Sequence, residues 1–426
     1  MIRFEASNHR SIADSVELSM VAIDRDRAEA RDQPMLGESL LPIAAVFGPN
    51  ASGKSNIVAA FAWVCDAVQD SLRAWDDEIP VEPFAFGAGP SIPSEFTIEA
   101  IIDGIRFDYV LMIDREKVLY EALFHYPERK RRRIFERDGA DFKIQRGLGG
   151  ISGTRELLTE RTLALSVARR FDEPLVSDFI RDLLRTQTLG FQSRRSLLDL
   201  LGLYTPVAQR AATLHWFEEG DQPSLFEDQK LGVSGDRDQA LALLRLADLG
   251  IDDVVIDVQE VTFPGMEMHT QRKIVRLVHR VTGDSVPLDF ASESAGTRTW
   301  FDLIGPVLTA LRNGSLLLFD ELDASLHPTL SAQLIHLFHD PATNPLGAQL
   351  VFTSHDTSLL NHLNRDEVWL TTKRPDGSTR LGALAEFAGE RVRKSQNLEN
   401  AYLHGRFGAL PQVDQTAFLR ALGLIG

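Results

Sequence analysis

The chain has 426 residues, of which 44% are apolar and 25% are charged, the ordinary mixture of a globular protein. Lysine and arginine number 45 against 61 aspartate and glutamate residues, giving a formal charge of −16, which argues against a protein that coats nucleic acid through bulk charge. The single cysteine, Cys65, excludes an intrachain disulfide framework and a cysteine-built zinc site, and it favours a reducing, cytoplasmic setting.

The first 150 residues are predicted to be strand-rich around one helix. Short strands are expected at 2–6 and 16–21, and an apolar run at 41–47 predicts a strand that ends at Gly48. Alternation of apolar and polar residues over 95–113, interrupted by Asp103-Gly104, predicts a hairpin with a type I′ turn.

The opening residues lack the apolar core of a signal peptide, and no apolar run is long enough to span a bilayer, so neither secretion nor membrane insertion is expected.

A glycine-rich loop follows the strand predicted at 41–47. Residues 48–55 read G-P-N-A-S-G-K-S and match the phosphate-loop pattern G-x-x-x-x-G-K-S/T. Such a loop turns successive backbone N–H groups toward phosphate oxygens, and its glycines allow an approach that a Cβ would block. We therefore expect Lys54 to bind the phosphates of ATP and the Ser55 hydroxyl to bind Mg²⁺. The residues predicted to bind the nucleotide here are Gly48, Pro49, Asn50, Ala51, Ser52, Gly53, Lys54, Ser55 and Asn56.

A helix is predicted directly after the loop, because Ile57, Phe61, Val64 and Val68 recur at helical spacing. The N-terminus of this helix would present its positive end to the bound anion. Cys65 lies on the same apolar stripe, so we interpret it as a small buried hydrophobe rather than a reactive thiol.

The densest basic run stands between two predicted strands, at 119–126 and 133–137. It consists of Arg129, Lys130, Arg131, Arg132 and Arg133. Such a run can contact a phosphate backbone without reading bases, and it can equally be a solvated hairpin tip. No interleaved aromatic residue supports a platform that stacks single-stranded bases.

The middle of the chain changes character. Residues 151–217 have leucines at helical spacing among many charged residues, which favours helices. Residues 218–238 are strongly acidic and are interpreted as a solvated surface loop, with a functional lid as the alternative. After about residue 240, helices and short strands are expected to alternate.

A serine-rich segment, S-E-S-A-G-T at 292–297, precedes a predicted helix. Ser294 is a plausible N-cap, and its hydroxyl together with the Gly296 N–H can hold a terminal phosphate. The alternative is an ordinary capped helix. Pro306 is expected to kink this helix.

Two apolar strands with polar tips complete the pattern. The run at 315–319 ends in Asp320 and Glu321, a Walker B pattern in which the first carboxylate holds Mg²⁺ and the second orients and deprotonates the attacking water. The run at 349–353 leads to His355, whose neutral imidazole can hydrogen-bond a terminal phosphate or the water. The predicted catalytic residues are Glu321, His355 and Lys54, and the predicted metal ligands are Ser55 and Asp320.

The spacing of these motifs implies a split core. Lys54 and Asp320 are 266 residues apart (320 − 54), more than a single compact nucleotide-binding fold needs. We predict an α/β fold in which a mixed β N-terminal lobe and a mostly parallel core sheet come from residues 1–150 and 310–426. Residues 151–309 would form an inserted helical lobe that carries the 292–297 segment.

Taken together, the motifs GPNASGKSN, SESAGT, LLLFDELDASLHP and FTSHD resemble the ABC-type ATPase heads of SMC and related recombination-repair proteins. They resemble more closely the AAA-type ATPases of bacterial abortive-infection and phage-defence operons, which lack coiled coils. The segments SNHRSIADSVELSM, LADLGIDD, DPATNPLGAQLVFTSHDTSLL and NLENAYLHGRFGALP are also similar to that family, so the resemblance covers most of the chain.

The resemblance implies a head-to-head homodimer that sandwiches two ATP molecules. Each site would combine Lys54, Ser55, Asp320, Glu321 and His355 of one chain with Ser294 and Gly296 of the other. It also implies that Arg10 lies near the nucleotide phosphates. Because the contacts between chains would exist only with ATP bound, the dimer would act as a switch.

The chain departs from the pattern of the ABC-type family at two places, and one further residue of that pattern is not assigned. The 292–297 segment reads S-A-G-T rather than S-G-G-Q, and His327 stands where the family usually has aspartate. The glutamine of the family's Q-loop has three candidates, Gln145, Gln187 and Gln192.

These observations predict an ATP-hydrolysing switch that senses a trigger and controls a separate effector, a nuclease or toxin, in defence against phage. No heptad-bearing arm is visible, and we expect no Toprim-like nuclease domain after the ATPase motifs, because only 71 residues follow His355. Two alternatives remain: a repair or recombination ATPase that loads directly on DNA, and a module that uses ATP as structural glue. Glu321 argues against the second alternative, since a scaffold needs no poised carboxylate.

Overall fold

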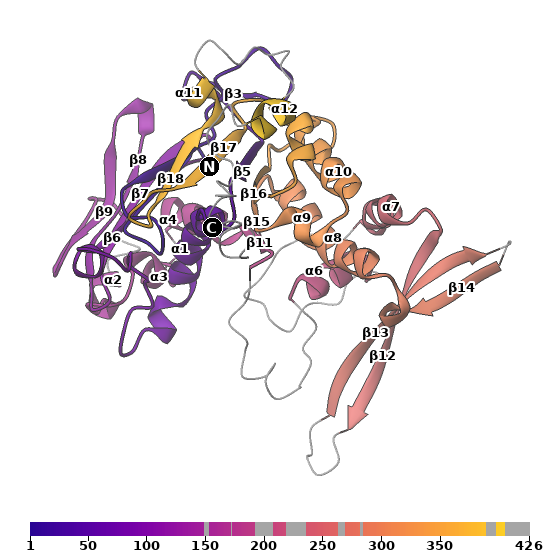
Figure 1. Cartoon of the computed structure of the whole chain (residues 1–426). Coiled ribbons are helices and arrows are strands. Elements are labelled where there is room, and N and C mark those ends of the chain that lie inside the picture. The colour runs from indigo at the N-terminus through magenta and orange to yellow at the C-terminus, as the bar shows by residue number, and fades with distance from the viewer. Residues whose placement is uncertain are drawn as a thin grey trace, which may run out of the picture.

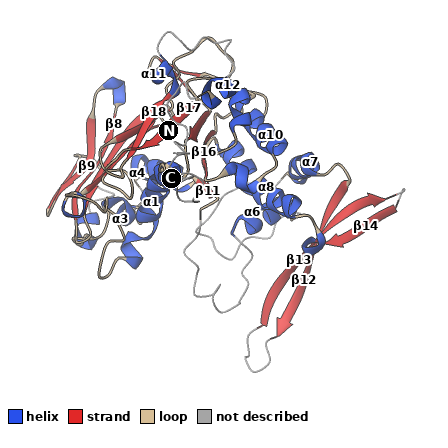
Figure 2. Cartoon of the chain, in the orientation of Figure 1, coloured by secondary structure: helices blue, strands red, loops and turns tan. Residues whose placement is uncertain are grey.

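The computed structural model shows a β-rich lobe, a covered core sheet and a small projecting sheet (Figures 1 and 2). It describes residues 1–148, 153–171, 173–191, 208–218, 236–262, 269–281, 284–388 and 398–404. Within these ranges, no helix has both the length and the apolar character needed to cross a membrane.

A seven-stranded antiparallel sheet builds the N-terminal lobe, in the order β10-β9-β8-β7-β6-β1-β2. Its strands are β1 (Arg3–Ser7), β2 (Val16–Ser19), β6 (Ser94–Ile102), β7 (Ile105–Ile113), β8 (Val118–His125), β9 (Arg132–Asp138) and β10 (Asp141–Ile144). The predicted hairpin is confirmed as β6–β7. Asp103 and Gly104 have φ angles of 48° and 76°, and a type I′ turn requires positive φ at both positions.

The core sheet has six strands in the order β11-β15-β16-β5-β17-β18. They are β11 (Gln187–Leu189), β15 (Leu316–Phe319), β16 (Gln349–Thr353), β5 (Ile43–Phe47), β17 (Val368–Lys373) and β18 (Thr379–Ala383). The first five are parallel and β18 is an antiparallel edge. Side chains of β5 alternate between two hydrophobic cores, Ala44 and Val46 in one and Ile43, Ala45 and Phe47 in the other. Both faces of the sheet are therefore covered, as the continuous apolar runs predict.

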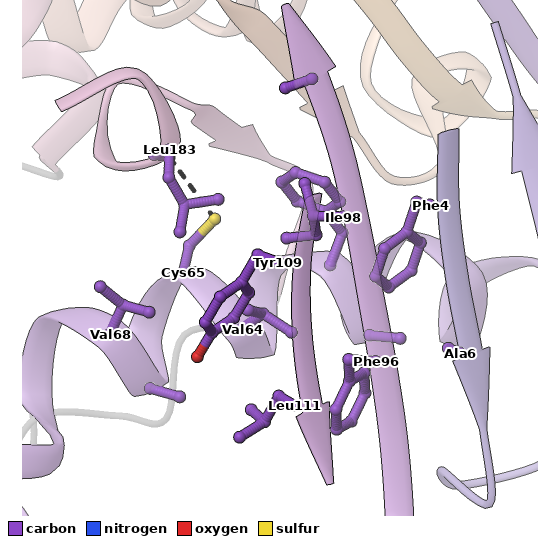
Figure 3. Packing of buried hydrophobic residues seen from close by; sticks show 14 of the residues in the cluster. Phe4, Ala6, Val64, Cys65, Val68, Phe96, Ile98, Tyr109, Leu111 and Leu183 are labelled. Atoms are coloured by element: carbon purple, nitrogen blue, oxygen red, sulfur yellow. Dashed lines mark hydrogen bonds between the residues drawn. The ribbon is translucent and has the colours of Figure 1, made fainter. Parts of the chain in front are cut away.

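Helix α1 (Lys54–Ala74) packs between the two sheets (Figure 1). Figure 3 shows its residues Val64, Cys65 and Val68 among side chains of the N-terminal lobe. Cys65 is buried, its thiol donates to the Leu183 carbonyl at 3.6 Å, and burial raises the pKa of the thiol. The interpretation of Cys65 as a buried hydrophobe is confirmed.

Three helices and one strand from the 154–189 region lie with this lobe and the core sheet. The helices are α2 (Thr154–Leu157), α3 (Ala164–Ala168) and α4 (Pro174–Leu184), and the last two pack on α1. Strand β11 then joins the core sheet beside β15. The predicted lobe boundaries at 150 and 309 stay a proposal.

A second group of helices covers the other face of the core sheet. It comprises α6 (Ala208–Phe217), α7 (Arg237–Ala247), α8 (Ala295–Asn313), α9 (Leu322–Ser325) and α10 (Pro328–His339). A three-stranded antiparallel sheet projects from this group (Figure 1), formed by β12 (Ile251–Thr262), β13 (His269–Val281) and β14 (Asp284–Asp289). Two of its strands are longer than the short strands that the sequence led us to expect. The remaining elements are β3 (Arg31–Gln33), β4 (Glu38–Leu40), α11 (Leu384–Ala388) and α12 (Leu398–Leu403).

Helix α8 contains Pro306, which cannot donate a hydrogen bond to the carbonyl of Asp302. Thr213 of α6 compensates at this point. Its hydroxyl accepts from the Gly305 N–H at 2.8 Å and lies 2.8 Å from the carbonyl oxygen of Phe301, to which it donates. The absence of a side chain at Gly305 makes this possible, because a Cβ there would lie 2.3 Å from the Thr213 nitrogen. The two helices therefore meet where α8 is weakest.

We predict that Thr213→Val lowers the free energy of unfolding by about 2 kcal/mol, since it leaves a buried N–H and a buried carbonyl without their partner. The measurement is the shift of the thermal unfolding midpoint. Thr213→Ser, which keeps the hydroxyl, is the control and should unfold close to the wild-type temperature. A valine variant as stable as the serine variant would contradict this role.

Candidate functional site

The parallel order of β15, β16 and β5 gathers three distant segments at one edge of the core sheet. The loop 48–53 follows β5, the pair Asp320-Glu321 follows β15, and His355 follows β16. Direct contacts join them. The Lys54 ammonium lies 3.3 Å from His355 Nδ1 of the imidazole ring. The backbone N–H of His355 donates to Asp323 Oδ1 at 3.0 Å. The predicted phosphate loop and the predicted carboxylates therefore occupy one site.

Lys54 is buried at the start of α1, with a side chain that turns back into the loop. Its ammonium donates to the carbonyls of Gly48 at 2.9 Å and Pro49 at 3.2 Å. Burial lowers the pKa of Lys54 to about 8, against three nearby carboxylates that raise it. These carboxylates belong to Asp323, Asp320 and Glu321. A cation held by carbonyls in a buried place can exchange them for phosphate oxygens, which are stronger acceptors.

The contact between Lys54 and His355 assigns the imidazole tautomer. A lysine ammonium has no acceptor, so His355 Nδ1 must accept and the proton of the neutral ring sits on Nε2. The side chain of His355 is exposed. Its Nε2–H is therefore a donor available to an anion or a water in front of the loop.

Thr353, the last residue of β16, contacts both residues of the β15 tip. Its hydroxyl donates to Asp320 Oδ1 at 2.7 Å and accepts from the Glu321 N–H at 2.8 Å. One oxygen of Asp320 is thereby fixed, which leaves the other for a cation. The same hydroxyl anchors the Glu321 backbone, so the Asp320 carboxylate and the Glu321 main chain are fixed by one group.

Glu321 has a left-handed backbone, with φ 54° and ψ 55°, although it is not glycine. This conformation costs about 1 kcal/mol or more for a residue with a Cβ. Its side chain is exposed, open to a water molecule. A left-handed backbone at a non-glycine residue thus holds an exposed carboxylate close enough to the buried Lys54 ammonium to raise the pKa of the lysine.

Two threonines of the β17–β18 hairpin hold the phosphate loop. Thr371 Oγ1 lies 2.6 Å from Ser52 Oγ and donates to the Phe47 carbonyl at 3.1 Å, and Thr379 Oγ1 donates to the Ser52 carbonyl at 2.9 Å. Each threonine fills the space beside one loop glycine. A Cβ on Gly48 would lie 2.3 Å from Thr371 Oγ1, and a Cβ on Gly53 would lie 1.9 Å from Thr379 Oγ1. Both loop glycines are thus required by packing as well as by their positive φ angles of 154° and 99°.

The turn between β1 and β2 lies beside the loop as well. Ser11 Oγ accepts from Asn56 Nδ2 at 2.6 Å and lies 2.7 Å from Thr379 Oγ1. Arg10, one residue earlier, has φ 50° and donates from Nη2 to Glu82 Oε1 at 3.0 Å. Arg10 is therefore a neighbour of the loop, with its guanidinium on Glu82.

The donors fit a nucleotide with Mg²⁺. Ser55 lies in the first turn of α1 and Asp320 keeps one carboxylate oxygen outside the Thr353 contact, so hydroxyl and carboxylate oxygens, the ligands that Mg²⁺ prefers, come from the two predicted residues. Among the other loop residues, Asn50 and Ala51 are exposed and Ser52 is buried. Ala51 has φ 60°, and the Ser52 N–H donates to the Pro49 carbonyl at 3.2 Å, which together form a tight turn.

The 292–297 segment lies at the start of α8. Ser294 is its N-cap and accepts from the Thr297 N–H at 3.0 Å, as the sequence predicts. Ser294 and Gly296 are both exposed, and a Cβ on Gly296 would meet nothing closer than 3.8 Å. Neither residue makes a hydrogen bond to the phosphate loop within the described ranges. Their proposed place in a partner's site is consistent with this exposure and stays a proposal.

The remaining predicted residues fall in different places. Gln145 directly follows β10, and its backbone N–H donates to the Ile134 carbonyl. Gln187 is the first residue of β11, and its side-chain amide donates to the Arg185 carbonyl. Gln192 lies outside the described residues. His327 is the N-cap of α10 and accepts from the Thr329 N–H at 3.3 Å, which gives the unusual histidine a structural role. Of the acidic segment 218–238, residues 219–235 lie outside the described residues.

The basic run is divided by its ion pairs. Arg131 is paired with Asp108 at 3.0 Å and lies over the Phe124 ring, and Arg133 is paired with Glu136 at 2.8 Å. Arg129 donates to the carbonyl of Pro34. Lys130 and Arg132 are exposed and have no acidic partner among the residues that the structure describes. Together with the exposed Arg129, whose partner is an uncharged carbonyl, these two carry the charge that no carboxylate neutralises among the described residues.

The structure adds site residues that the sequence did not single out. They are Thr353, Thr371 and Thr379, with Asp323 as the acceptor for the His355 N–H. The signal for Thr353 was a single hydroxyl at the end of an apolar strand. Thr371 and Thr379 carry no local signal, because their partners are more than 300 residues away.

Comparison with known proteins gives one family. The model of an AAA domain family, whose description associates it with the AbiEii toxin of a type IV toxin–antitoxin system, matches residues 43–361. No curated protein matches the chain. The match and the observed sheet confirm the prediction of an α/β P-loop NTPase head.

The chain is also similar to solved SMC heads. One, bound to the C-terminal winged-helix domain of ScpA, matches 89% of this chain and 97% of its own, at 12% identity and a TM-score of 0.45. The SMC head domain from Thermotoga maritima matches 90% and 98%, at 12% identity and a TM-score of 0.40. An Smc head with an extended coiled coil, bound to the C-terminal domain of ScpA derived from Pyrococcus furiosus, matches 90% and 96%, at 11% and 0.39.

Gly190, directly after β11, supports the tip of β15. It has φ 79°, and a Cβ there would lie 1.9 Å from the Asp320 carbonyl oxygen. We predict that Gly190→Ala destabilises the chain by about 3 kcal/mol, the sum of the left-handed backbone and the clash.

Gly104→Ala is the matched control, since Gly104 has φ 76° with nothing within 4 Å of its Cβ position. It should cost about 1 kcal/mol, the backbone contribution alone. Thermal unfolding midpoints of the two variants provide the comparison. Equal midpoints would show that the contact between Gly190 and Asp320 is not close.

Proposed function

Since the chain belongs to the AAA domain family associated with the AbiEii toxin, we propose that it hydrolyses ATP to ADP and phosphate. The observation that supports this most directly is the convergence of Lys54, His355 and the Asp320-Glu321 pair at the C-terminal edge of the core sheet. A phosphate loop alone binds a nucleotide. A strained, exposed carboxylate anchored beside it adds the means to activate water.

Each residue has a distinct part in the proposed reaction. Lys54 binds the phosphates and neutralises the charge that develops on them, and backbone N–H groups of 48–53 do the same. Ser55 and Asp320 would hold Mg²⁺, which supplies further charge stabilisation when bound. Glu321 orients the attacking water and accepts its proton, while the His355 Nε2–H donates to the terminal phosphate or to the water.

We further propose that two chains meet head to head, so that exposed Ser294 and Gly296 of one chain complete the site of the other. The exposure of both residues and the free N-terminus of α8 support this arrangement. Because this contact requires a terminal phosphate, ATP would close the dimer and hydrolysis would open it. The switch would control a separate effector, a nuclease or toxin, in cytoplasmic defence against phage, and the toxin–antitoxin association in the family description supports the toxin part of this proposal.

A second candidate function is direct action on DNA or RNA. It is favoured by Lys130 and Arg132, two exposed cations at one hairpin tip. Their charge suits phosphate backbone contact without base recognition. Arg129, Arg131 and Arg133 already have protein partners, so the contact would be smaller than the five-residue run implies.

We predict that Glu321→Gln lowers ATP turnover at least about 100-fold, since it removes the base but keeps the shape of the side chain. ATP binding should stay within about twofold, and dimers should accumulate with ATP. Phosphate release and light scattering after size-exclusion chromatography measure the two effects. Glu116→Gln, which changes an exposed carboxylate in a distant turn, is the control. Wild-type turnover in Glu321→Gln would refute the catalytic assignment.

A pH dependence follows from the pKa of Lys54, about 8 in the nucleotide-free chain. Bound phosphates keep the ammonium protonated, so binding takes up a proton above this pKa. ATP affinity should therefore be constant near neutrality and fall by about tenfold per pH unit above the pKa of about 8. Calorimetric titration between about pH 7.5 and about pH 9.5 measures it, against Lys54→Arg, which stays charged throughout. A flat profile for the wild type would contradict the assignment.

A further inference from the structure

One aromatic ring near the phosphate loop is left open to solvent. Phe86 is 63% exposed, although its neighbour Phe84 is buried and contacts it edge to face at 5.5 Å. An exposed phenyl ring does not gain the favourable free energy of burial, so the exposure of Phe86 is consistent with a ligand that covers the ring. It stands on the irregular segment between α1 and β6.

This segment is held firmly. The buried Asn8 side chain donates to the carbonyls of Gly89 and Ile92, at 2.9 and 2.7 Å, and accepts from the Phe84 N–H at 3.1 Å. The Arg10 N–H donates to the Glu82 carbonyl at 2.7 Å. The backbone on both sides of Phe86 is therefore fixed by hydrogen bonds.

The same contacts place Phe86 beside the phosphate loop. A Cβ on Gly377 would lie 3.4 Å from the edge of the Phe86 ring, and Gly377 precedes Thr379 by two residues. The Thr379 hydroxyl holds the Ser52 carbonyl of the loop at 2.9 Å. On the N-terminal side of Phe86, Glu82 accepts a hydrogen bond from the side chain of Arg10, and the next residue, Ser11, contacts Thr379. The two paths meet at Thr379, because Ser11 Oγ lies 2.7 Å from Thr379 Oγ1, and together they place the ring on the side of the loop where the hairpin and the β1–β2 turn lie.

We infer that Phe86 is the platform on which the base of the bound nucleotide stacks. The inference rests on the proposed function and adds to it a base subsite, formed by the ring with Gly377 at its edge. Stacking uses the face that every base presents and reads no hydrogen-bonding edge, so the subsite would take the base of a nucleoside triphosphate by its flat surface without selecting it by hydrogen bonds. The triphosphate would supply most of the affinity through the loop, and the ring would add the contribution of the base.

The test separates base from phosphates. Binding of ATP and of inorganic tripolyphosphate, each with Mg²⁺, is measured by calorimetry for the wild type, Phe86→Ala, Phe86→Tyr and Leu346→Ala. Phe86→Ala should weaken ATP binding about tenfold and leave tripolyphosphate binding unchanged. Phe86→Tyr keeps the ring and should bind ATP like the wild type. Leu346 is also 63% exposed but precedes β16 at the opposite edge of the core sheet, so Leu346→Ala controls for loss of an exposed apolar side chain.

Two results would overturn the inference. One is equal ATP affinity of Phe86→Ala and the wild type. The other is an equal loss for ATP and tripolyphosphate, which would mean that the ring only shapes the loop. Failure of the proposed function looks different, because it is the absence of phosphate release from ATP by the wild type, whatever the affinities of the Phe86 variants.

Discussion

A buried ammonium organises the site. Lys54 carries a charge into a place that is almost closed to water, and an unpaired charge there would cost several kcal/mol. Its partners come from three segments: two loop carbonyls, the His355 ring and the carboxylates that follow β15. These segments meet because β5, β16 and β15 are neighbours and run in one direction. The sheet order is therefore the physical condition for the chemistry, and the threonines at the strand ends fix its details.

One continuous run of chain joins the two parts of the proposed dimer site. Helix α8 begins at the exposed Ser294 cap, ends at Gly314 and leads into β15, whose tip carries Asp320 and Glu321. The weak point of this run is Pro306, and beside it the Thr213 hydroxyl of α6 bonds the Gly305 N–H and the Phe301 carbonyl and lies 3.4 Å from the Asp302 carbonyl oxygen. The helix that would contact a partner's nucleotide is thus joined by a short connection to the strand that carries the carboxylates.

The sequence predicted those parts of the molecule whose signal is local. The phosphate loop, the apolar stripe of α1, the type I′ turn at Asp103-Gly104 and the covered strands β15 and β16 all follow from short-range patterns, and the structure has them. Strand β11 was not predicted, because three residues are too few for periodicity, and its place depends on pairing with β15. Thr371 and Thr379 look like ordinary strand residues until the register of the β17–β18 hairpin is known. Arg10 was linked to the nucleotide by resemblance, and the structure brings its turn to the loop through Ser11 while its guanidinium pairs with Glu82.

The hold of Thr371 and Thr379 on the phosphate loop has a consequence for biosynthesis. Thr371 reaches back 324 residues to the Phe47 carbonyl, and Thr379 reaches back 327 residues to that of Ser52. While the ribosome is still translating the middle of the message, the hydroxyls of Thr371 and Thr379 have not yet been made. Strand β17, which pairs with β5 beside the loop, is also still missing. The motif is among the first parts to be made, yet it acquires its working shape only when translation is nearly finished. A truncated product that ends before the β17–β18 hairpin would carry the complete motif without the framework that shapes it.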